Sequence, residues 1–523
     1  MGISLSWITD SIAGQAPYVE PDRSAIGLDG GTPLTYADLR AAELRCAGAL
    51  QRAGVRPGDR VGMILRNSID YLVFYLATAR VGAISVRLNF RLTGPEARFI
   101  LEDSGAKMLV FEADLEDRIA GVRDELTVET YVVREEGGTG PEWAMALSDF
   151  LDGAAECDSP SLGLDHPATM LYTSGTTGAP KGAIWTHGNS LWFASIQAMK
   201  WKFDPDTVAM TPGPLFHAGG LEALLLPALT SHGTAITFSS GSFDLERFLE
   251  ASRAQSATTL MLYSFMVYDF LRLPNVADLI PPTLTRITCG GDIVMPWVYD
   301  EFEKRLPGIE LVQLYGLTEG GAISTCLDHD FARDHPASVG RPMPMTEVKV
   351  VGEGGAELRS GEVGEVHVRS PAVSPGFWER PEATEQTFSD GWCRTGDLGT
   401  IDADGFLSLA GRAKDMIRSG AENVYPAEVE AILTLAPAVA DAALVGVPDP
   451  KYVEVGCAVL IPKAGEKIDL EEVRSFCAER LAGFKIPKHF VIADELPRTA
   501  SGKVKKFELR DQYRSYGGPP PSR

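Results

Sequence analysis

The sequence predicts an α/β protein: a large amino-terminal domain of several subdomains with mostly parallel sheets, which includes a small β-rich subdomain, and a small α+β domain at the carboxyl end. Two patterns predict this arrangement. Before about residue 348, short unbroken apolar runs alternate with helix-like segments, as buried parallel strands and their crossover helices do. After Val348, strand-like runs follow one another between glycine-rich turns, with little helix between them.

The alternation is clear in the first part of the chain. Residues 35–54 open with Thr35, carry apolar residues at helical spacing and end near Gly54, which indicates a helix. Two further segments, 70–81 and 243–255, show the same spacing. The apolar runs between these helices are the expected parallel strands: residues 61–65, 107–111, 169–172, 234–238, 258–262 and 284–288.

The β-rich subdomain is expected around strand-like residues 347–351 and 364–368. A segment dense in glycine and charge then runs from Gly411 to Pro426, and a compact unit follows it. We place the boundary so that residues 1–413 form the first domain and residues 414–523 the second, a usual domain size. The second domain is expected to contain helices 427–435 and 470–481, strands 442–447, 456–461 and 489–493, and a disordered glycine- and proline-rich tail at 517–523.

Composition excludes several classes of function. The 523 residues carry a formal net charge of −23, which argues against a broad basic face for nucleic acid or anionic lipid. The longest apolar run, residues 221–229, contains Glu222 and Pro227 and is too short to cross a membrane, so no transmembrane segment is expected. Seven widely spaced cysteines without a C-x-x-C pair fit a reducing cytoplasm better than disulfides or a zinc cluster.

A loop rich in small hydroxylated residues follows the apolar run 169–172. It consists of Thr173, Ser174, Gly175, Thr176, Thr177, Gly178, Ala179, Pro180, Lys181 and Gly182. Glycines let backbone N–H groups turn towards phosphate oxygens, and hydroxyls and a lysine add further donors. Its spacing does not fit a Walker A loop, and the alternative is an ordinary surface loop.

The loop resembles the phosphate-binding signature of the adenylate-forming superfamily, which contains acyl-CoA synthetases, peptide-synthetase adenylation domains and beetle luciferases. Further signatures of that superfamily follow in its order. They are Tyr315-Gly-Leu-Thr-Glu319, Arg394-Thr-Gly-Asp397, Gly411-Arg-Ala-Lys-Asp415 with its continuation to Pro426, and Pro497-Arg-Thr-Ala-Ser-Gly-Lys503. The resemblance therefore extends from the helix at Thr35 to Lys503.

The resemblance implies a site for ATP and Mg²⁺. Glu319 corresponds to the Mg²⁺ ligand and Thr318 to a phosphate contact, and one carboxylate with substrate phosphates suits this hard cation. Tyr315 would lie against the adenine, beside Gly316, with Gly291, Asp292 and Gln313 around the ring. Asp292 is a departure, because relatives usually carry alanine there, and its carboxylate would accept from the adenine amino group.

Other residues are assigned by the same resemblance. Asp397 and Arg412 correspond to the ribose contacts, and a carboxylate can accept two diol hydrogen bonds. Lys503 would reach the substrate carboxylate and phosphate during adenylation, and Lys414 occupies the position of a hinge about which the carboxyl-terminal domain moves. The loop that would line the coenzyme A path contains Arg418, Gly420, Ala421 and Asn423. Ala421 stands where the family commonly has glycine, and its methyl group narrows that path.

The segment Leu215-Phe-His-Ala-Gly-Gly220 resembles the wall of an acyl pocket, which His217 would close. Amino-acid-activating relatives place an aspartate nearby to pair with the substrate ammonium. None follows Phe216 here, and Glu222 is the nearest acid, which favours an acid without an α-amino group. Further walls are expected near Tyr263, Gly290 and Ala322, without specifying the size of the acid.

The expected function is therefore an ATP- and Mg²⁺-dependent acyl-CoA synthetase in the cytoplasm, which joins a small-molecule carboxylic acid to coenzyme A through an acyl-adenylate, with a rotation of the carboxyl-terminal domain between the two steps. Close alternatives are an enzyme that loads a carrier protein, or one that runs only one half-reaction. A luciferase-like oxygenase and a nucleotide-binding protein without catalysis are less expected, the latter because Lys181, Glu319, Asp397 and Lys503 are all present. We expect no nucleic-acid partner and leave a homodimer open.

Overall fold

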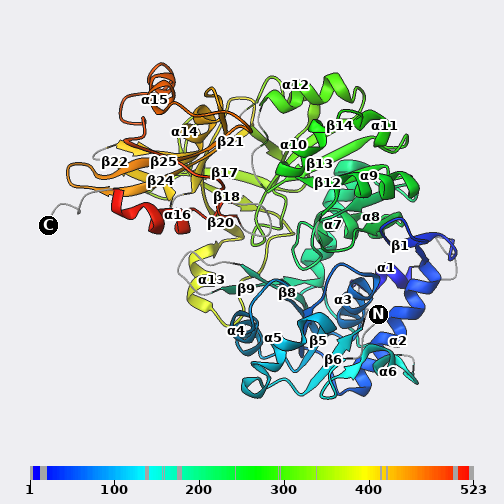
Figure 1. The fold of residues 1–523 in the computed structure, drawn as a ribbon. Coiled ribbons are helices and arrows are strands. Elements are labelled where there is room, and N and C mark those ends of the chain that lie inside the picture. The colour runs from blue at the N-terminus through cyan, green and yellow to red at the C-terminus, as the bar shows by residue number, and fades with distance from the viewer. Residues whose placement is uncertain are drawn as a thin grey trace.

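The computed structural model of the chain describes residues 4–11, 20–135, 140–155, 157, 159–173, 180–241, 243–291, 294, 296–336, 338–412, 415–419, 422–498 and 504–516. Figure 1 shows that the amino-terminal part forms one lobe, the middle of the chain a second and the carboxyl-terminal part a third. Short strands alternate with helices in the first two lobes, as expected for an α/β protein.

The sheet of the first lobe has the order β7-β6-β5-β3-β4-β8-β9 and is parallel except for the β8–β9 hairpin. Its strands are β3 (Arg60–Ile64), β4 (Ile84–Arg87), β5 (Met108–Glu112), β6 (Thr130–Arg134), β7 (Met145–Ala146), β8 (Pro167–Thr173) and β9 (Lys181–Thr186). The connecting helices include α3 (Ile69–Arg80), α4 (Gly94–Ser104), η1 (Ala113–Leu115), α5 (Glu116–Ala120), η2 (Arg123–Glu125) and α6 (Leu147–Leu151).

The second lobe contains a parallel array in the order β11-β10-β12-β13-β14, with the amino-terminal strand β1 parallel to β11 at its edge. The strands are β1 (Ser24–Leu28), β2 (Leu34–Thr35), β10 (Val208–Thr211), β11 (Thr234–Thr237), β12 (Thr259–Tyr263), β13 (Arg286–Gly290) and β14 (Glu310–Tyr315). The helices are α1 (Trp7–Asp10), α2 (Tyr36–Arg52), α7 (His187–Trp201), the π-helix η3 (Leu221–Leu225), α8 (Leu226–Thr230), α9 (Leu245–Ala254), α10 (Ser264–Arg272), α11 (Val276–Leu279) and α12 (Pro296–Arg305).

The β-rich region continues this second sheet. Antiparallel strands extend it from β14 in the order β15-β16-β21-β20-β18-β17. They are β15 (Thr325–Leu327), β16 (Ser338–Pro342), β17 (Glu347–Val351), β18 (Gly364–Arg369), β19 (Phe388–Ser389), β20 (Trp392–Ile401) and β21 (Leu407–Arg412), with helices η4 (His329–Phe331) and α13 (Pro381–Thr387). The predicted subdomain is thus hydrogen-bonded to the parallel array through β15 and β16.

The carboxyl-terminal part has its own sheet and its own apolar clusters. Its elements are β22 (Ile417–Ser419), β23 (Glu422–Val424), α14 (Pro426–Leu433), β24 (Val439–Asp449), β25 (Val453–Pro462), α15 (Leu470–Ala478), β26 (His489–Ile492), α16 (Lys506–Tyr513) and η6 (Arg514–Tyr516). The predicted α+β composition is confirmed. The proposed boundary at 413/414 and the tail 517–523 lie outside the described residues.

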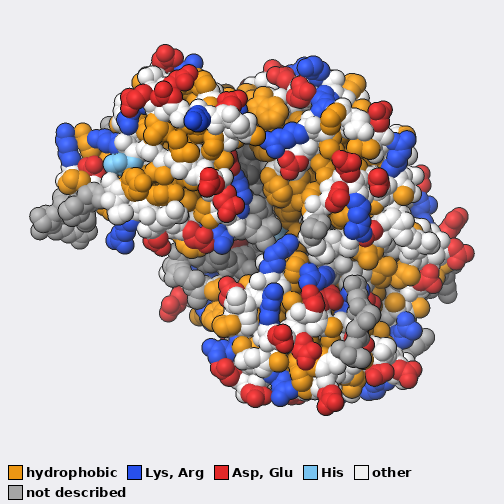
Figure 2. All heavy atoms as spheres, viewed as in Figure 1, with side chains coloured by type: hydrophobic (Ala, Val, Ile, Leu, Met, Phe, Trp, Pro, Cys, Tyr) orange, Lys and Arg blue, Asp and Glu red, His pale blue; other side chains and the backbone are white. Residues whose placement is uncertain are grey.

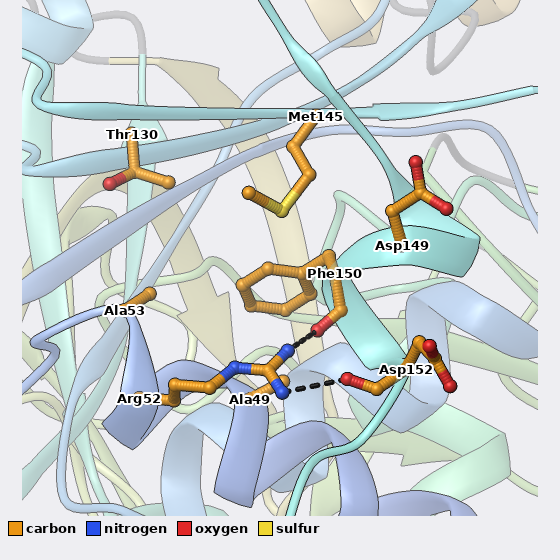
Figure 3. Close-up of a pocket in the computed structure, with 8 residues that line it drawn as sticks. All are labelled: Ala49, Arg52, Ala53, Thr130, Met145, Asp149, Phe150 and Asp152. Carbon is orange, nitrogen blue, oxygen red and sulfur yellow. Dashed lines mark hydrogen bonds between the residues drawn. The ribbon is translucent and has the colours of Figure 1, made fainter.

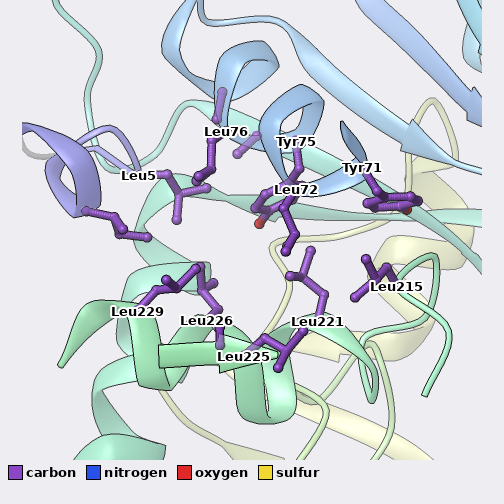
Figure 4. Packing of buried hydrophobic residues seen from close by; sticks show 14 of the residues in the cluster. Leu5, Tyr71, Leu72, Tyr75, Leu76, Leu215, Leu221, Leu225, Leu226 and Leu229 are labelled. Carbon is purple, nitrogen blue, oxygen red and sulfur yellow. The ribbon is translucent and has the colours of Figure 1, made fainter. Parts of the chain in front are cut away.

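The largest apolar cluster joins the first two lobes. Figure 4 shows leucines of α3, among them Leu72 and Leu76, facing Leu225 and Leu229 of η3 and α8, with Leu5 of the amino-terminal segment beside them. Helix α2 begins at a capping box formed by Thr35 and Asp38, which satisfies free backbone N–H groups at the predicted start. Within the described residues, no helix combines the length and apolar character needed to cross a membrane.

Gly340 in β16 occupies the join between the two parts of the long sheet, and it has φ +91°. A Cβ atom there would lie 1.8 Å from the carbonyl oxygen of Cys326 on β15. We predict that Gly340→Ala lowers the free energy of unfolding by about 2–5 kcal/mol, from backbone strain and overpacking together. Chemical denaturation would measure it.

Gly355→Ala is the matched control. Gly355 also has a positive φ, but nothing lies within 4 Å of its added Cβ, so about 1–2 kcal/mol of strain is expected. Equal losses in the two variants would contradict the proposed crowding at the join.

Candidate functional site

The candidate site lies where three parallel strands of the second lobe end. Strands β12, β13 and β14 are in register, so that Tyr263 lies opposite Gly290 and Gly290 opposite Leu314, next to Tyr315. The crevice beyond the carboxyl ends of parallel strands is the usual ligand position in such sheets. Figure 2 shows the molecular face hollowed between the lobes, with basic and apolar side chains along its walls.

Tyr315, Asp397 and Arg412 form one connected group. The Tyr315 hydroxyl donates to Oδ2 of Asp397 at 2.7 Å, and the Nε of Arg412 lies 3.0 Å from Oδ1. Asp397 and Arg412 also face each other in the β20–β21 ladder. Thr395 fixes this part of β20, since its hydroxyl accepts from the Asp397 N–H and donates to the Val366 carbonyl oxygen. Burial, followed by the nearby Asp397 carboxylate, raises the pKa of Tyr315 well above its usual value, so the phenol remains a donor.

Glu319 is hydrogen-bonded to β8, the strand that precedes the candidate phosphate-binding loop. The Thr173 hydroxyl at the end of β8 donates to Oε1 of Glu319 at 2.7 Å. Thr173 and Lys181 are paired across the β8–β9 ladder, and residues 174–179 between them lie outside the described residues. The Lys181 ammonium lies 5.5 Å from the centre of the Phe377 ring. The structure therefore brings together the predicted Thr173, Lys181 and Glu319.

The loop after β14 is fixed on both sides. The indole N–H of Trp185 donates to the carbonyl oxygen of Thr318 at 3.0 Å, and the Ser374 N–H donates to that of Glu319 at 3.0 Å. Position 316 requires glycine, because a Cβ atom there would lie 2.4 Å from the carbonyl oxygen of Ala322. Trp185 and Ser374 were not predicted from the sequence, because their hydrogen-bond partners lie far away along the chain. Trp185 and Thr318 are 133 residues apart.

The structure describes two of the three residues expected around the adenine ring, Gly291 and Gln313. Gly291 follows β13 with φ +98°. Gln313 is buried, and its carboxamide oxygen accepts hydrogen bonds from the Val294 N–H at 3.0 Å and the Tyr299 hydroxyl at 3.1 Å. Gln313 thus anchors the start of α12 to β14, and its contact with an adenine ring stays a prediction. Asp292 lies outside the described residues.

The segment 215–222, which we call the acid-pocket segment, connects β10 to the π-helix. His217 accepts the Gly219 N–H on Nδ1 at 3.1 Å, which places the proton of a neutral imidazole on Nε2. Phe216 packs edge-on against Phe90 at 5.7 Å between ring centres. Of the expected pocket walls, Tyr263 is buried at the end of β12, and Ala322 has φ +58°.

Glu222 is committed to a buried ion pair. Its carboxylate lies 2.9 Å from the guanidinium of Arg87 at the end of β4, and both side chains are 0% exposed. Burial raises the pKa of Glu222, and the Arg87 charge opposes that rise. From the sequence, Glu222 was identified only as the nearest acid, and Arg87 was not identified. A charge inside an apolar run was the available signal, because such a charge requires a buried partner.

Two of the residues predicted to line the coenzyme A path lie in the β22–β23 hairpin. Arg418 and Asn423 are paired across this hairpin, and Arg418 is exposed. Besides Asp292, the predicted site residues that lie outside the described part of the chain are Ser174, Gly175, Thr176, Thr177, Gly178, Lys414, Gly420, Ala421 and Lys503.

A separate concavity lies between α2 and α6 (Figure 3), lined by residues including Ala49, Met145 and Phe150. Its Arg52 guanidinium donates to the carbonyl oxygens of Asp152 at 2.7 Å and Phe150 at 2.5 Å. These bonds fasten α6 to α2. The concavity is formed by α2 together with β6, β7 and α6 of the first lobe and contains none of the predicted site residues.

Comparison with known proteins gives consistent matches. Residues 15–378 match the family described as AMP-binding enzyme, and residues 428–503 match the AMP-binding enzyme C-terminal domain. The chain is 38% identical over 486 residues to a feruloyl-CoA synthase of an Amycolatopsis species, covering 92% of this chain and 95% of the relative. It is 33% identical over 522 residues to a long-chain-fatty-acid–CoA ligase of Mycobacterium tuberculosis, covering 98% of each chain. The structure resembles o-succinylbenzoate CoA synthetase from Bacillus subtilis in complex with its acyl-adenylate intermediate, with a TM-score of 0.85, 30% identity and coverage of 97% of this chain and 98% of that one.

Proposed function

This chain belongs to the AMP-binding enzyme family, and we propose that it is an AMP-forming acyl-CoA synthetase whose nucleotide site is the Tyr315–Asp397–Arg412 group. The observation that carries the proposal is the position of this group beside Glu319 and Thr173 at the ends of parallel strands. In the first half-reaction a carboxylate oxygen attacks the α-phosphorus of ATP and pyrophosphate leaves. In the second, the thiol of coenzyme A attacks the acyl carbonyl carbon, and AMP leaves.

Asp397 is proposed to accept hydrogen bonds from the ribose hydroxyls. Its position is fixed from two sides, by the Tyr315 hydroxyl and by the Arg412 guanidinium. A carboxylate held in this way is preorganised for a diol and need not reorganise on binding. Tyr315, whose ring is almost fully buried at the strand end, would offer a face to adenine.

Mg²⁺ is proposed to bind at Glu319. No group of three or more His, Cys, Asp or Glu side chains in the described part of the chain is arranged to hold a metal. One carboxylate with an adjacent hydroxyl oxygen fits a cation that takes most of its oxygens from phosphates and water. When bound, Mg²⁺ would neutralise charge on the phosphates, while Thr173 and Lys181 orient them from the hairpin.

The two half-reactions are proposed to use different faces of a carboxyl-terminal domain comprising residues 414–523. Lys503 would serve adenylation, and the loop 418–423 would serve thioester formation after rotation about Lys414. The separate carboxyl-terminal sheet and its own apolar clusters support a unit that can move as a body. The runner-up is transfer of the acyl group to a carrier protein, which requires the same chemistry with another thiol.

The acid is proposed to be an aryl carboxylic acid without an α-amino group. Glu222 is occupied by Arg87 and offers no free carboxylate to a substrate ammonium. The aromatic pair Phe216–Phe90 adjoins the acid-pocket segment. The chain is also similar to a feruloyl-CoA synthase and to an o-succinylbenzoate CoA synthetase. A long-chain fatty acid is the alternative, favoured by the similar ligase from Mycobacterium tuberculosis. We propose the cytoplasm as the location, because the described cysteines form no disulfide, as is usual in a reducing compartment.

Acid-dependent exchange of pyrophosphate into ATP tests this function directly. A panel would contain hydroxycinnamic, benzoic and arylacetic acids, saturated fatty acids and amino acids, each assayed with and without coenzyme A. We predict exchange with at least one aryl acid, none with amino acids, and an acyl-CoA product detected by mass spectrometry. Exchange with none of the acids would contradict adenylation, and preference for long-chain acids would contradict the aryl class.

We predict that Asp397→Ala raises the KM for ATP at least about tenfold, since a hydrogen bond to a charged group contributes about 1.5–3 kcal/mol. Tyr315→Phe should raise it less, because the carboxylate remains but loses one of its two supports. Arg394→Ala is the control. Arg394 lies on the same strand as Asp397, but its side chain is exposed and pairs with Glu365 of β18. The KM for ATP should therefore stay unchanged. An equal KM for ATP in Asp397→Ala and the wild type would show that Asp397 does not bind the nucleotide.

We predict that Lys503→Ala abolishes pyrophosphate exchange but leaves coenzyme A transfer from supplied acyl-adenylate largely intact. The lysine charge is needed where two anions meet, and such preorganised charges contribute about 2.7–4 kcal/mol to the barrier. Lys506→Ala is a control nearby in the sequence, because Lys506 is paired with Glu430 within the carboxyl-terminal part. Parallel loss of both half-reactions in Lys503→Ala would refute a role confined to adenylation.

A further inference from the structure

The acid-pocket segment is held from behind by side chains of the other lobe. The carboxamide oxygen of Asn67 accepts the Leu215 N–H at 2.8 Å, and its N–H group donates to the Gly213 carbonyl oxygen at 2.9 Å. The Arg87 guanidinium donates to the carbonyl oxygen of Leu215 at 3.2 Å. Asn67 follows β3 and Arg87 ends β4, so the first sheet determines where the wall of the acid pocket lies in the second lobe.

Arg87 holds the other end of the segment as well. It pairs with Glu222, which lies near the start of the π-helix, so one guanidinium ties residues 215 and 222 together. Its planar fork of donors allows both contacts at once, which an ammonium cannot reproduce. Figure 4 shows Leu215 and Leu221 from either end of this segment facing Tyr71 and Leu72 of α3.

The surroundings compensate the ion pair only in part. The Arg87 guanidinium lies over the Tyr75 ring, 5.6 Å from its centre, but among the described residues the Nε of Arg87 and the hydroxyl of Tyr71 are buried without a hydrogen-bond partner. Replacing a buried ion pair by apolar residues of similar volume is often neutral or stabilising, so the pair is a poor source of stability. The geometry of the segment is what this pair maintains.

We propose that the Arg87–Glu222 pair is a positioning device that determines how well the carboxylic acid binds, without touching ATP or the reacting atoms. The proposal rests on the proposed function, since it requires the acid to lie against segment 215–222. Removing the pair should let the segment shift towards or away from the acid, while the Tyr315–Asp397–Arg412 group, on other strands, keeps its place.

The test is the double substitution Arg87→Met with Glu222→Leu, which removes both charges together and leaves neither buried alone. Pyrophosphate exchange with the best wild-type acid should show a KM for the acid raised about ten- to a hundredfold, as expected for a displaced binding wall. The KM for ATP and the melting temperature should stay close to wild type. Arg87→Lys should also raise the KM for the acid, because lysine keeps the charge opposite Glu222 but loses the simultaneous contact with Leu215.

A second buried pair supplies a matched control. Arg80 of α3 and Glu43 of α2 lie 2.8 Å apart, with 2% and 0% exposure, and Arg80 also pairs with Asp10; within the described residues, neither forms a hydrogen bond or ion pair with the acid-pocket segment. Arg80→Met with Glu43→Leu should leave the KM for the acid unchanged.

Two results would overturn the inference: an unchanged KM for the acid in the Arg87/Glu222 variant, or an equal rise in the Arg80/Glu43 variant. If the double variant does not fold, Arg87→Lys decides by the same criterion. Failure of the wild type to exchange with any acid would instead contradict the proposed function.

Discussion

The curvature of the long sheet between β14 and β20 is the constraint on which the nucleotide site depends. Four strand-to-strand steps separate Tyr315 on β14 from Asp397 on β20, and in a flat sheet these steps would cover about 19 Å. The Tyr315 hydroxyl nevertheless lies 2.7 Å from Asp397. The sheet must therefore curl back on itself, and the shift in register between Ser338 and Gly340 marks where it bends.

This curvature explains why the site combines two kinds of strand. Parallel strands supply a crevice at their carboxyl ends, whereas the antiparallel strand β20 supplies a carboxylate, Asp397, from within its length. Neither part contains the complete group by itself. The buried ion pairs serve a comparable purpose between segments, since Arg87 and Arg80 each connect parts of the chain that the apolar cluster alone would leave free to slide.

Much of the fold followed from local patterns. The apolar run at 61–65 predicted β3 to within one residue, because buried strands require continuous apolar side chains. The prediction at 347–351 coincides with β17, where three valines are interrupted by Lys349. Helix α7 was not predicted. It opens with His187, Gly188 and Asn189, which favour helices weakly, and depends on a capping box at Thr186 and burial against its neighbours.

The candidate site was predicted less completely, for a physical reason. Tyr315, Asp397 and Glu319 were identified through motifs, but the hydrogen bonds of Tyr315 to Asp397 and of Thr173 to Glu319 join positions 82 and 146 residues apart. No local pattern encodes such a contact, because it depends on how whole sheets pack. The roles of Lys503, Lys414 and Ala421 stay predictions from the sequence.

The burial of the amino-terminal segment has a consequence for biosynthesis. The Leu5 N–H donates to His187 and Ser11 contacts His232, partners that lie 182 and 221 residues further along the chain. Strand β1 likewise cannot pair with β11 until residues 234–237 have been synthesised. At about 5–20 residues per second, a ribosome needs roughly 10–45 s to synthesise those partners. This segment therefore leaves the ribosome well before its native partners do, and its apolar side chains must be kept from other contacts during that interval.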